Sequence, residues 1–444
     1  MVFKFGAYRS VTAALFLFAA LHNPCAAQTL SAKESDPRVM GWMEGFPPPR
    51  DKLITQPDSN YFSFPKLRWS VCHLREFLPT EAISRGLGAP NPLKYLPSAE
   101  FADKRKAIDA LTFTPMNSDH EMTWEDSLYT NYTDGILIIH RNRVVYERYF
   151  GCLQEDRKHA AMSMTKSVTG LLAGIMVAEG ALDDKALVRD IIPEIGDSAF
   201  ATATVREVMD MTTGVQYSED YSDPKADIWL YSAAASPLPK PDGYSGPDGY
   251  WEYLQQVRPE GKHGEQFHYK TINSDMLGWI ISRVSGKAVT ELASERLWRR
   301  MGAEQDAYQT VDGKGVPFAG GGLTAGLRDL GRLGLLMLDE GVINGERLFP
   351  AEVVQKIRAG GDPSKFAGFP TIPGGSYTSQ WWVFHNKHGA FAARGVHGQT
   401  IYVDPTADMV LVRFASFPRA QNGYIDPTSL PAYQAVAEYL MSKD

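Results

Sequence analysis

Short apolar runs occur near residue 140 and again near residue 400, with a long segment between them. Residues 135–140 and 143–150 are rich in β-branched and aromatic side chains, and only Arg141-Asn142 separates them. This pattern predicts a β-hairpin. Residues 393–403 and 409–414 have the same character, with an aspartate-proline turn between them. We therefore expect strands that are distant in sequence to meet in one sheet.

Helical periodicity dominates the segment between these strands. Residues 163–179 carry apolar side chains at helical spacing, and Gly180 stands where a helix would end. Further helices are predicted over 103–111, 204–211, 273–284, 289–301, 327–338 and 432–441. Residues 217–262 contain many Tyr, Pro, Asp, Gly and Ser and few aliphatic residues, which predicts long surface loops.

The order of these elements predicts an α+β fold. One antiparallel sheet flanked by helices would form the main body, and the middle helices would form a mainly helical second lobe. We assign the sheet domain to 61–200 and 302–444, and the helical and loop lobe to 201–301. Residues 28–60, rich in Pro, Asp and Ser, are expected to form an extended lead-in.

Composition narrows the class of protein. The 444 residues are 44% hydrophobic and carry a formal net charge of −7. This is an ordinary globular composition, which excludes disordered and collagen-like classes. The mild acidity argues against a nucleic-acid partner, because nucleic-acid binding favours a basic face.

The first 27 residues have the pattern of a secretory signal peptide. Lys4 and Arg9 precede an apolar run over 11–21, and small residues before Gln28 favour cleavage after Ala27. The alternative is an uncleaved anchor. No later hydrophobic run is long enough to cross a bilayer. We therefore expect a periplasmic or secreted protein without a stable membrane span after cleavage.

Three cysteines are too few for a disulfide scaffold. Cleavage would remove Cys25 and leave Cys72 and Cys152. An oxidising compartment permits a disulfide between them, but the sequence does not indicate one. The oligomeric state is also left open.

A serine nucleophile is the strongest candidate chemistry. In Ser163-Met-Thr-Lys166, the serine and the lysine are three residues apart at the start of a predicted helix, so their side chains would be neighbours. A serine hydroxyl needs a base to remove its proton, and burial at a helix N-terminus favours the neutral, basic form of lysine. The same spacing occurs at Ser63 and Ser222, but proline precedes the lysine in both places. The alternative is a helix start with a solvated lysine.

Two further motifs accompany this pair. Tyr269 and Asn273 precede or open a predicted helix. A tyrosine whose pKa is lowered by a nearby amine could transfer protons, and Asn273 could orient the substrate, although both could equally be packing and capping residues. In 395–399, Gly-Val-His-Gly-Gln, glycines on an edge strand would allow close approach of a substrate backbone and supply an oxyanion donor. The alternative is a glycine bulge.

The three motifs together resemble the serine β-lactamase and penicillin-binding-protein superfamily. The resemblance is strongest to its class C-like branch, which holds the 6-aminohexanoate-dimer (nylon-oligomer) hydrolases and related carboxylesterases. It extends over about 41–440 and includes 68–69, 73–74, 162–166, 220–224, 267–269, 320–322, 380–382 and 395–399.

The resemblance implies roles for individual residues. Ser163 would be acylated, Lys166 would be its general base, and Tyr269 would relay protons to the leaving group. The backbone N–H groups of Ser163 and Val396 would form the oxyanion hole. On the substrate side, the residues implied or suspected are Tyr221, Asn273, Trp382, His397 and Gly398. The substrate would be a small amide or ester, and no cofactor is required.

Two departures from the family bear on the substrate. Penicillin-recognising relatives carry a Lys-Thr-Gly triad on the strand facing the nucleophile, whereas this chain has His397 and no lysine there. The spacing from Tyr269 to Asn273 is four residues, where class C β-lactamases have two. A D,D-peptidase or β-lactamase, and a non-catalytic binding protein on the same fold, remain the alternative functions. His385 and His388 lack a nearby acidic third ligand, so we expect no metal site.

Overall fold

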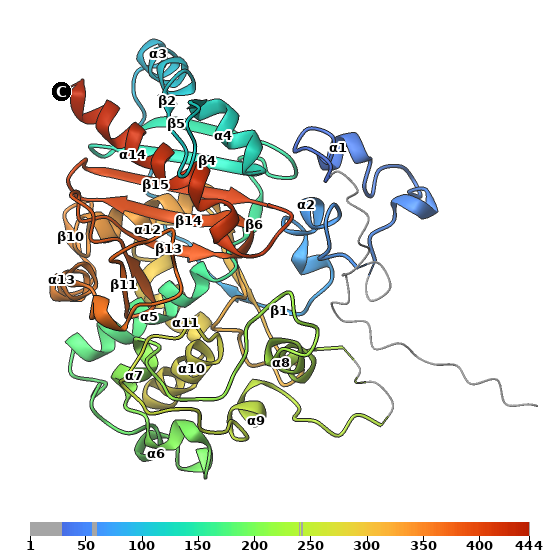
Figure 1. Ribbon diagram of the computed structural model, residues 1–444, viewed down its shortest axis with the longest axis vertical. Coiled ribbons are helices and arrows are strands. Elements are labelled where there is room, and N and C mark those ends of the chain that lie inside the picture. The colour runs from blue at the N-terminus through green and yellow to red at the C-terminus, as the bar shows by residue number, and fades with distance from the viewer. Residues whose placement is uncertain (1–28, 56–59, 239, 241–242, 444) are drawn as a thin grey trace, which may run out of the picture.

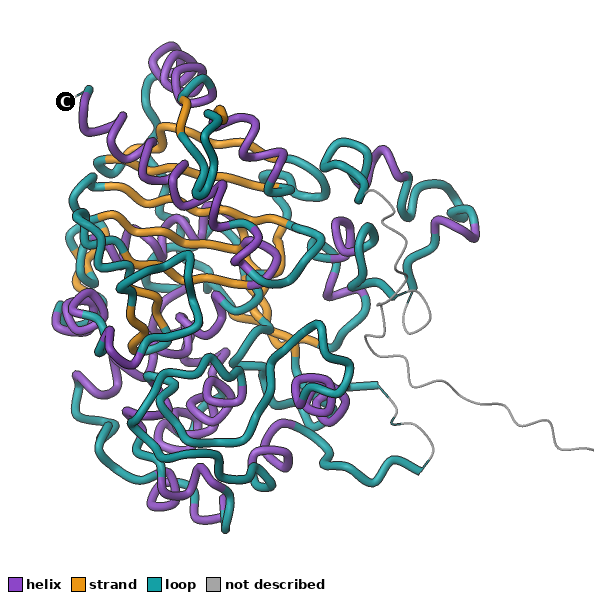
Figure 2. Tube along the Cα trace, viewed as in Figure 1, coloured by secondary structure: helices purple, strands orange, loops and turns teal. Residues whose placement is uncertain are grey.

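The computed structural model describes residues 29–55, 60–238, 240 and 243–443; the predicted signal peptide lies outside this range. A seven-stranded antiparallel sheet forms the centre (Figures 1 and 2). Its strands, in spatial order, are β11 (Ser376–Thr378), β12 (Trp381–Val383), β13 (Phe391–Gly395), β14 (Gln399–Asp404), β15 (Met409–Ala415), β4 (Thr133–His140) and β5 (Arg143–Tyr149). The α+β class is therefore confirmed.

The predicted hairpin is β4–β5. Arg141 and Asn142 both have positive φ, 49° and 58°, as a type I′ turn requires. On its other side β4 pairs with β15, which brings Ile136 opposite Arg413. Strands from the two ends of the chain thus lie side by side, as their patterns predicted.

Helices cover both faces of this sheet. Side chains of β4 alternate in direction: Ile136 and Ile138 pack with Tyr433, whereas Leu137 and Ile139 face the opposite core. The helices on the first face are α3 (Ser98–Asp109), α4 (Trp124–Thr130) and α14 (Asp426–Ser442); those on the second are α5 (Met164–Ala178) and α12 (Leu327–Leu338). Figure 1 shows α14 in front of the strands and α12 behind them.

The prediction of one sheet was incomplete. A second antiparallel sheet has the order β1 (Thr80–Ile83), β7 (Ala307–Thr310), β8 (Leu323–Gly326) and β6 (Lys158–Ala160). Two-stranded pairs are β2 (Thr112–Phe113) with β3 (Met122–Thr123), and β9 (Val342–Ile343) with β10 (Glu346–Arg347). These strands have two to four residues each, which is too short for alternation to be recognised in the sequence.

A mainly helical lobe lies below the main sheet in Figure 1. It contains α6 (Val188–Ile191), α7 (Val205–Met209), α8 (Asp227–Ala235), α9 (Tyr250–Leu254), α10 (Ile272–Ser285) and α11 (Val289–Ala293). Ser198 and Ala199 hydrogen-bond to residues 254 and 257, so the segment before the predicted boundary at 200 belongs with these helices. The helices α8 and α9 also correct the expectation that 217–262 is loop alone.

The strand predicted over 393–403 is two strands. Between β13 and β14 the chain makes a tight turn over Val396–Gly398, in which His397 has φ 64°. The predicted edge strand is also wrong, because β13 lies between β12 and β14. However, β12 pairs with β13 only at Phe391 and Ala392, so among the described strands the end of β13 is paired with β14 alone.

The N-terminal segment packs beside the start of α5. It contains α1 (Pro37–Met40) and α2 (Leu67–Ser70). Helix α13 (Glu352–Ala359) lies elsewhere, in the segment between α12 and β11. Cys72, just after α2, forms a disulfide bond with Cys152, with a Cα–Cα distance of 6.0 Å. The pairing that the sequence left open is thereby settled. No helix in the described ranges is long and apolar enough to span a bilayer.

Candidate active site

Ser163 occupies the junction between strand β6 and helix α5. The turn before it is fixed by backbone hydrogen bonds from Ala160 to Val71 and from Ala161 to Leu323, both 2.8 Å. Met162 has a positive φ of 49°, a conformation that costs free energy in a non-glycine residue and is common next to functional groups. Ser163 is 7% exposed, which leaves its hydroxyl at the edge of the protein interior.

Lys166 is the immediate partner of Ser163. Its Nζ lies 3.0 Å from Ser163 Oγ and 2.5 Å from the carbonyl oxygen of Gly320, and the residue is 1% exposed. Burial lowers the pKa of Lys166 to about 8, although the negative charges of Glu219 and Asp275 act against this shift. A substantial fraction of Lys166 is therefore neutral near pH 8 and can accept the serine proton.

The Gly320-Gly321-Gly322 segment passes close to α5. Thr165 Oγ1 accepts the N–H of Leu323 at 3.0 Å, and Thr169 Oγ1 donates to the carbonyl of Ala319 at 3.1 Å. A Cβ added to Gly320 would lie 2.6 Å from Thr271 Cγ2. Glycine is thus needed here so that the backbone carbonyl can reach the lysine amine.

Tyr269 lies across Ser163 and Lys166. Its ring centre is 5.2 Å from Lys166 Nζ, and it stacks on Trp382 at 5.4 Å between ring centres. The Ser163 side chain acts to lower the pKa of the phenol. Burial and the charge of Glu219 raise the pKa of Tyr269 well above its usual value. The expected lowering of this pKa is therefore wrong, and the residue is a neutral phenol that can donate and pass on a proton.

Glu219 organises the side of the site where Tyr221 lies, and sequence reasoning did not single it out. Its carboxylate accepts the Tyr221 hydroxyl at 2.8 Å and both the N–H and the hydroxyl of Thr271 at 2.7 Å. Tyr221 in turn packs edge-on against Trp229 at 6.0 Å. The carboxylate thus ties the loop that carries Tyr221 to the segment that carries Tyr269.

The turn after β13 touches the nucleophile segment. A Cβ built on Gly395 would lie 2.8 Å from the carbonyl oxygen of Ala161 and 3.0 Å from the backbone nitrogen of Ser163. Only glycine allows so close an approach. Val396 follows Gly395 directly in the chain, and its N–H and that of Ser163 are the pair predicted to form an oxyanion hole.

Three residues predicted to contact substrate point into the protein instead. Asn273 is fully buried and bonds to Thr213 at 2.6 Å and to the Lys270 carbonyl at 3.1 Å. His397 is directed at the carbonyl oxygen of Phe417, 2.7 Å from its Nδ1, and burial lowers its pKa to about 4. A Cβ on Gly398 would meet Ala415 and Ile425 at 3.1 Å, so it faces the interior. These assignments are corrected.

Arg394 is a second residue that sequence reasoning missed. It is 6% exposed, forms an ion pair with Asp426 and lies 5.3 Å from the ring centre of Trp382. Its positive charge acts on Tyr269 and opposes the rise in that pKa. A single buried arginine does not change the hydrophobic pattern of a strand, so the pattern does not reveal it. Its position directly before Gly395, in the motif at 395–399, was the available indication that it lies near the site.

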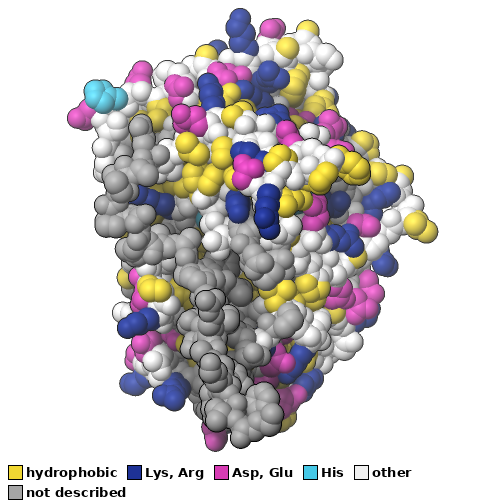
Figure 3. Space-filling model, turned by 90° about the vertical axis from the view of Figure 1, so that its right-hand side faces the viewer, with side chains coloured by type: hydrophobic (Ala, Val, Ile, Leu, Met, Phe, Trp, Pro, Cys, Tyr) yellow, Lys and Arg dark blue, Asp and Glu magenta, His cyan; other side chains and the backbone are white. Residues whose placement is uncertain are grey.

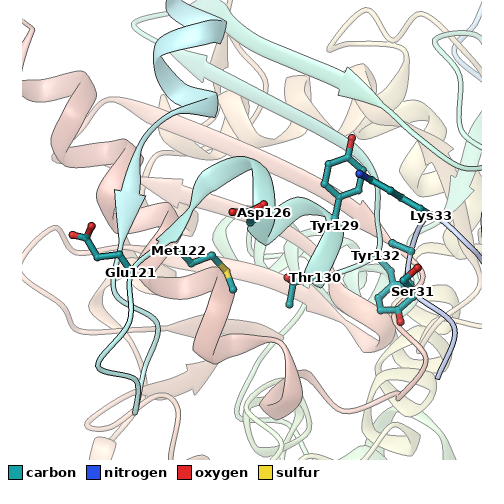
Figure 4. A pocket seen from close by; sticks show the side chains of 9 residues that line it. Ser31, Lys33, Glu121, Met122, Asp126, Tyr129, Thr130 and Tyr132 are labelled. Carbon is teal, nitrogen blue, oxygen red and sulfur yellow. The ribbon is translucent and has the colours of Figure 1, made fainter. Parts of the chain in front are cut away.

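Two other candidate sites offer weaker support for catalysis or metal binding. Cys72, Cys152 and His159 are close enough to hold a metal ion, but the two sulfurs are joined to each other. A hollow of about 630 Å³ lies between the N-terminal segment and α4 (Figure 4), with Lys33 over the ring of Tyr129. Ser163, Lys166 and Tyr269 do not line it.

A serine, a buried lysine and a tyrosine in mutual contact on this fold define a serine hydrolase of the β-lactamase type. The chain belongs to the Beta-lactamase family, whose model matches residues 130–427. It is 36% identical over 358 residues to 6-aminohexanoate-dimer hydrolase of Paenarthrobacter ureafaciens, covering 80% of this chain and 86% of that protein.

Solved structures agree with this assignment. A putative 6-aminohexanoate-dimer hydrolase from Bacillus anthracis superposes with a TM-score of 0.78 at 28% identity, covering 88% of this chain and 99% of the other. An octameric penicillin-binding protein homologue from Pyrococcus abyssi superposes with a TM-score of 0.53 at 19% identity, covering 70% and 75%. The second likeness concerns the fold alone.

Proposed function

We propose that this protein hydrolyses small amides or esters through an acyl-enzyme on Ser163. The observation that carries the proposal is the contact of Ser163 Oγ with a buried lysine whose pKa is lowered to about 8. Such an amine is a base of suitable strength for a serine hydroxyl, whereas an exposed lysine would be charged.

Each residue of the site has a separate role in the proposed reaction. Neutral Lys166 takes the proton of Ser163 as its oxygen attacks the substrate carbonyl, and the backbone N–H groups of Ser163 and Val396 stabilise the resulting oxyanion. Tyr269 gives its proton to the leaving amine or alcohol and recovers one from Lys166. In the second half, water loses a proton to the same pair and attacks the acyl group. The bond to Ser163 Oγ then breaks, the pair returns the proton to this oxygen, and the acid is released.

The substrate is proposed to be a short linear amide. The relative from Paenarthrobacter ureafaciens is named for hydrolysis of the 6-aminohexanoate dimer, and it aligns with 80% of this chain at 36% identity. Tyr221 and Trp382 adjoin Tyr269 from two sides and are proposed to contact the substrate. Esters share the same acyl chemistry and serve as convenient test substrates.

Action on β-lactams or D,D-peptides has less support. Those substrates present a carboxylate that needs a cation beside the nucleophile. Arg394 is the cation on β13, two residues before Val396, but Asp426 already neutralises it within the protein. A substrate carboxylate would have to displace a buried ion pair.

Export is proposed from the leader and the disulfide together. The residues before Gln28 have the signal-peptide pattern, and a bond between Cys72 and Cys152 is typical of an oxidising compartment. Cleavage after Ala27 would release a periplasmic or secreted enzyme.

Intact-mass spectrometry of residues 28–444 tests the catalytic proposal. A fluorophosphonate, benzylpenicillin and a p-nitrophenyl ester are each applied to the protein and to Ser163→Ala. We expect a phosphonate adduct and ester turnover that both require Ser163, with no stable penicilloyl species. A lasting penicilloyl adduct would support the peptidoglycan-directed alternative. Folded protein with no adduct from any probe would support a binding protein.

A further inference from the structure

Asp275 is a buried carboxylate in contact with the site that the proposed mechanism does not use. It lies on α10 and is 3% exposed. Its Oδ2 accepts the hydroxyl of Tyr231 at 2.5 Å, and its Oδ1 accepts the backbone N–H of Gly320 at 3.2 Å. A carboxylate in the interior costs free energy unless its partners compensate for lost solvation, and here those partners lead to the catalytic lysine.

Gly320 connects Asp275 to Lys166. The N–H of Gly320 donates to the carboxylate, while the carbonyl of the same residue accepts a hydrogen bond from Lys166 Nζ. A neutral amine has two N–H bonds and one lone pair. When one N–H is fixed on Gly320, the lone pair can be directed toward Ser163 Oγ, 3.0 Å away. The position of this carbonyl therefore sets the orientation of the base.

We propose that Asp275 is a positioning residue for Lys166 and that Tyr231 couples it to helix α8. The inference rests on the proposed function and deepens it. Tyr231 lies on α8 two residues after Trp229, the residue that packs against Tyr221. Three hydrogen bonds thus link α8, which adjoins the proposed substrate contact, with the catalytic base.

The charge of Asp275 also acts on the lysine. The groups that face Lys166 are Ser163 on its own helix, Tyr269 before α10, Glu219 in the loop before α8, and Asp275. Of these, the two carboxylates favour the charged form of Lys166. Burial raises the pKa of Asp275 to about 7, so Asp275 carries its charge mainly above that pH. Around Asp275 lie Tyr231, Tyr250 and Tyr217, which are neutral. Removing the charge of Asp275 therefore lowers the pKa of Lys166.

Asp275→Asn and Tyr231→Phe test the proposal, with Asp329→Asn as a matched control. Asp329 is 1% exposed and likewise accepts backbone N–H groups, from Glu304 and Gln305, but it lies on α12 outside the site. It also pairs with the buried Arg332, so Asp329→Asn tests loss of a buried charge under more demanding conditions than Asp275→Asn. We measure kcat/KM for a p-nitrophenyl ester from about pH 5 to about pH 10. Each preparation is normalised by titrating its active sites with the fluorophosphonate, so that misfolded protein does not contribute.

For Asp275→Asn we expect the plateau of kcat/KM to fall about tenfold or more, and the midpoint of its rise with pH to move down by about one unit. Tyr231→Phe keeps the carboxyl group but removes a hydrogen bond that lowers the pKa of Asp275, so its plateau should fall while the midpoint moves down less than in Asp275→Asn. Asp329→Asn should match the parent. If Asp275→Asn does not fold, Tyr231→Phe tests the proposal by itself: a lower plateau of kcat/KM supports it, and an unchanged plateau overturns it.

The outcomes separate this inference from the proposed function. A parent enzyme without Ser163-dependent turnover would contradict the proposed function itself. An active parent whose plateau and midpoint are unchanged in both variants would overturn the role of Asp275 alone. A lower active-site titre with an unchanged profile per site would show that Asp275 only stabilises the fold, and would overturn the inference as well.

Discussion

At the scale of single residues, the protonation state of Lys166 controls the rate of acylation in the proposed mechanism. The base form is the neutral amine, and its pKa is lowered to about 8 by burial. We therefore expect kcat/KM for acylation to rise with pH and to level off above about pH 8. His397 stays neutral because its pKa is lowered to about 4, so it should add no step near pH 6.5. Stopped-flow acylation by an activated ester checks this profile, and an acid limb near pH 6.5 that disappears in His397→Asn would contradict it.

Lys166→Ala and Tyr269→Phe should differ in which step they affect. Lys166→Ala removes the base and should abolish acylation, with less than about one-hundredth of the rate remaining. Tyr269→Phe keeps the stacking on Trp382 but removes the relayed proton, so it should mainly slow steady-state turnover. Burst and steady-state phases measured with the same ester separate the two steps. Equal, small effects of both variants would contradict the assigned roles.

The proposed catalytic residues Ser163, Lys166 and Tyr269 could be picked out from the sequence because they lie close together in the chain or within recognisable motifs. Ser163 and Lys166 lie three residues apart on one helix, and Tyr269 precedes another. Arg394 and Glu219 were missed because their importance comes from partners distant in the chain, Asp426 and Thr271. His397 and Asn273 were misplaced for a related reason: a motif gives the residue but not the direction of its side chain.

At the scale of elements, β13 closely approaches the start of α5, where the oxyanion hole is proposed to lie. In Gly395→Ala, the new methyl group would lie 2.8 Å from the Ala161 carbonyl and 3.0 Å from the Ser163 nitrogen, so the two segments must separate. We expect kcat to fall by about a hundredfold, as for loss of one oxyanion donor, with a smaller effect on KM. Steady-state kinetics measure this change.

Gly88→Ala is the control for this prediction. A Cβ at Gly88 meets no atom within 4 Å, so the variant should behave as the parent. Normal kcat in Gly395→Ala would mean that Val396 lies too far from the reacting carbonyl to matter. Thermal unfolding of both variants shows whether any loss reflects the site or the whole fold.

Elements with long periodic patterns were predicted well, and short ones were not. The hairpin β4–β5 and helices α5, α10 and α12 follow from apolar spacing that continues over several residues. The turn inside the predicted strand 393–403 was missed because glycine and histidine there are compatible with either conformation. Likewise, α8 and α9 are short helices among turn-forming residues, and tertiary contacts decide their conformation.

At the scale of the whole molecule, the charges visible on one face agree with the expectation of a small-molecule substrate. Among the described residues on the face shown in Figure 3, acidic and basic side chains are interspersed, and they form no broad basic area of the kind that nucleic-acid binding favours. The same face includes the N-terminal segment, which the disulfide fastens next to the catalytic turn.

The disulfide links this segment to the loop before the nucleophile. Cys152 packs in one cluster with Leu67, Val71 and Met162, and Val396 lies against the same cluster. The bond closes a loop of 80 residues, so its loss should lower the free energy of unfolding by about 2 to 5 kcal/mol. In the double variant Cys72→Ser, Cys152→Ser we expect a lower denaturant midpoint. We also expect lower activity per molecule, because Met162 and Val396 flank the reacting groups.

Three measurements make this prediction specific to the bond. The parent protein, unfolded without reductant, should be lighter by two hydrogens than its reduced form. Reductant added to the parent should reproduce the stability of the double variant and leave that variant unchanged. If the oxidised parent and the double variant share one denaturant midpoint and one kcat, the N-terminal segment is held without the bond. Its apolar packing and the buried ion pair of Arg68 with Asp134, at 3.0 Å, would then suffice. In that case the oxidising compartment contributes nothing to the fold, and export would have to be established by N-terminal sequencing after Ala27.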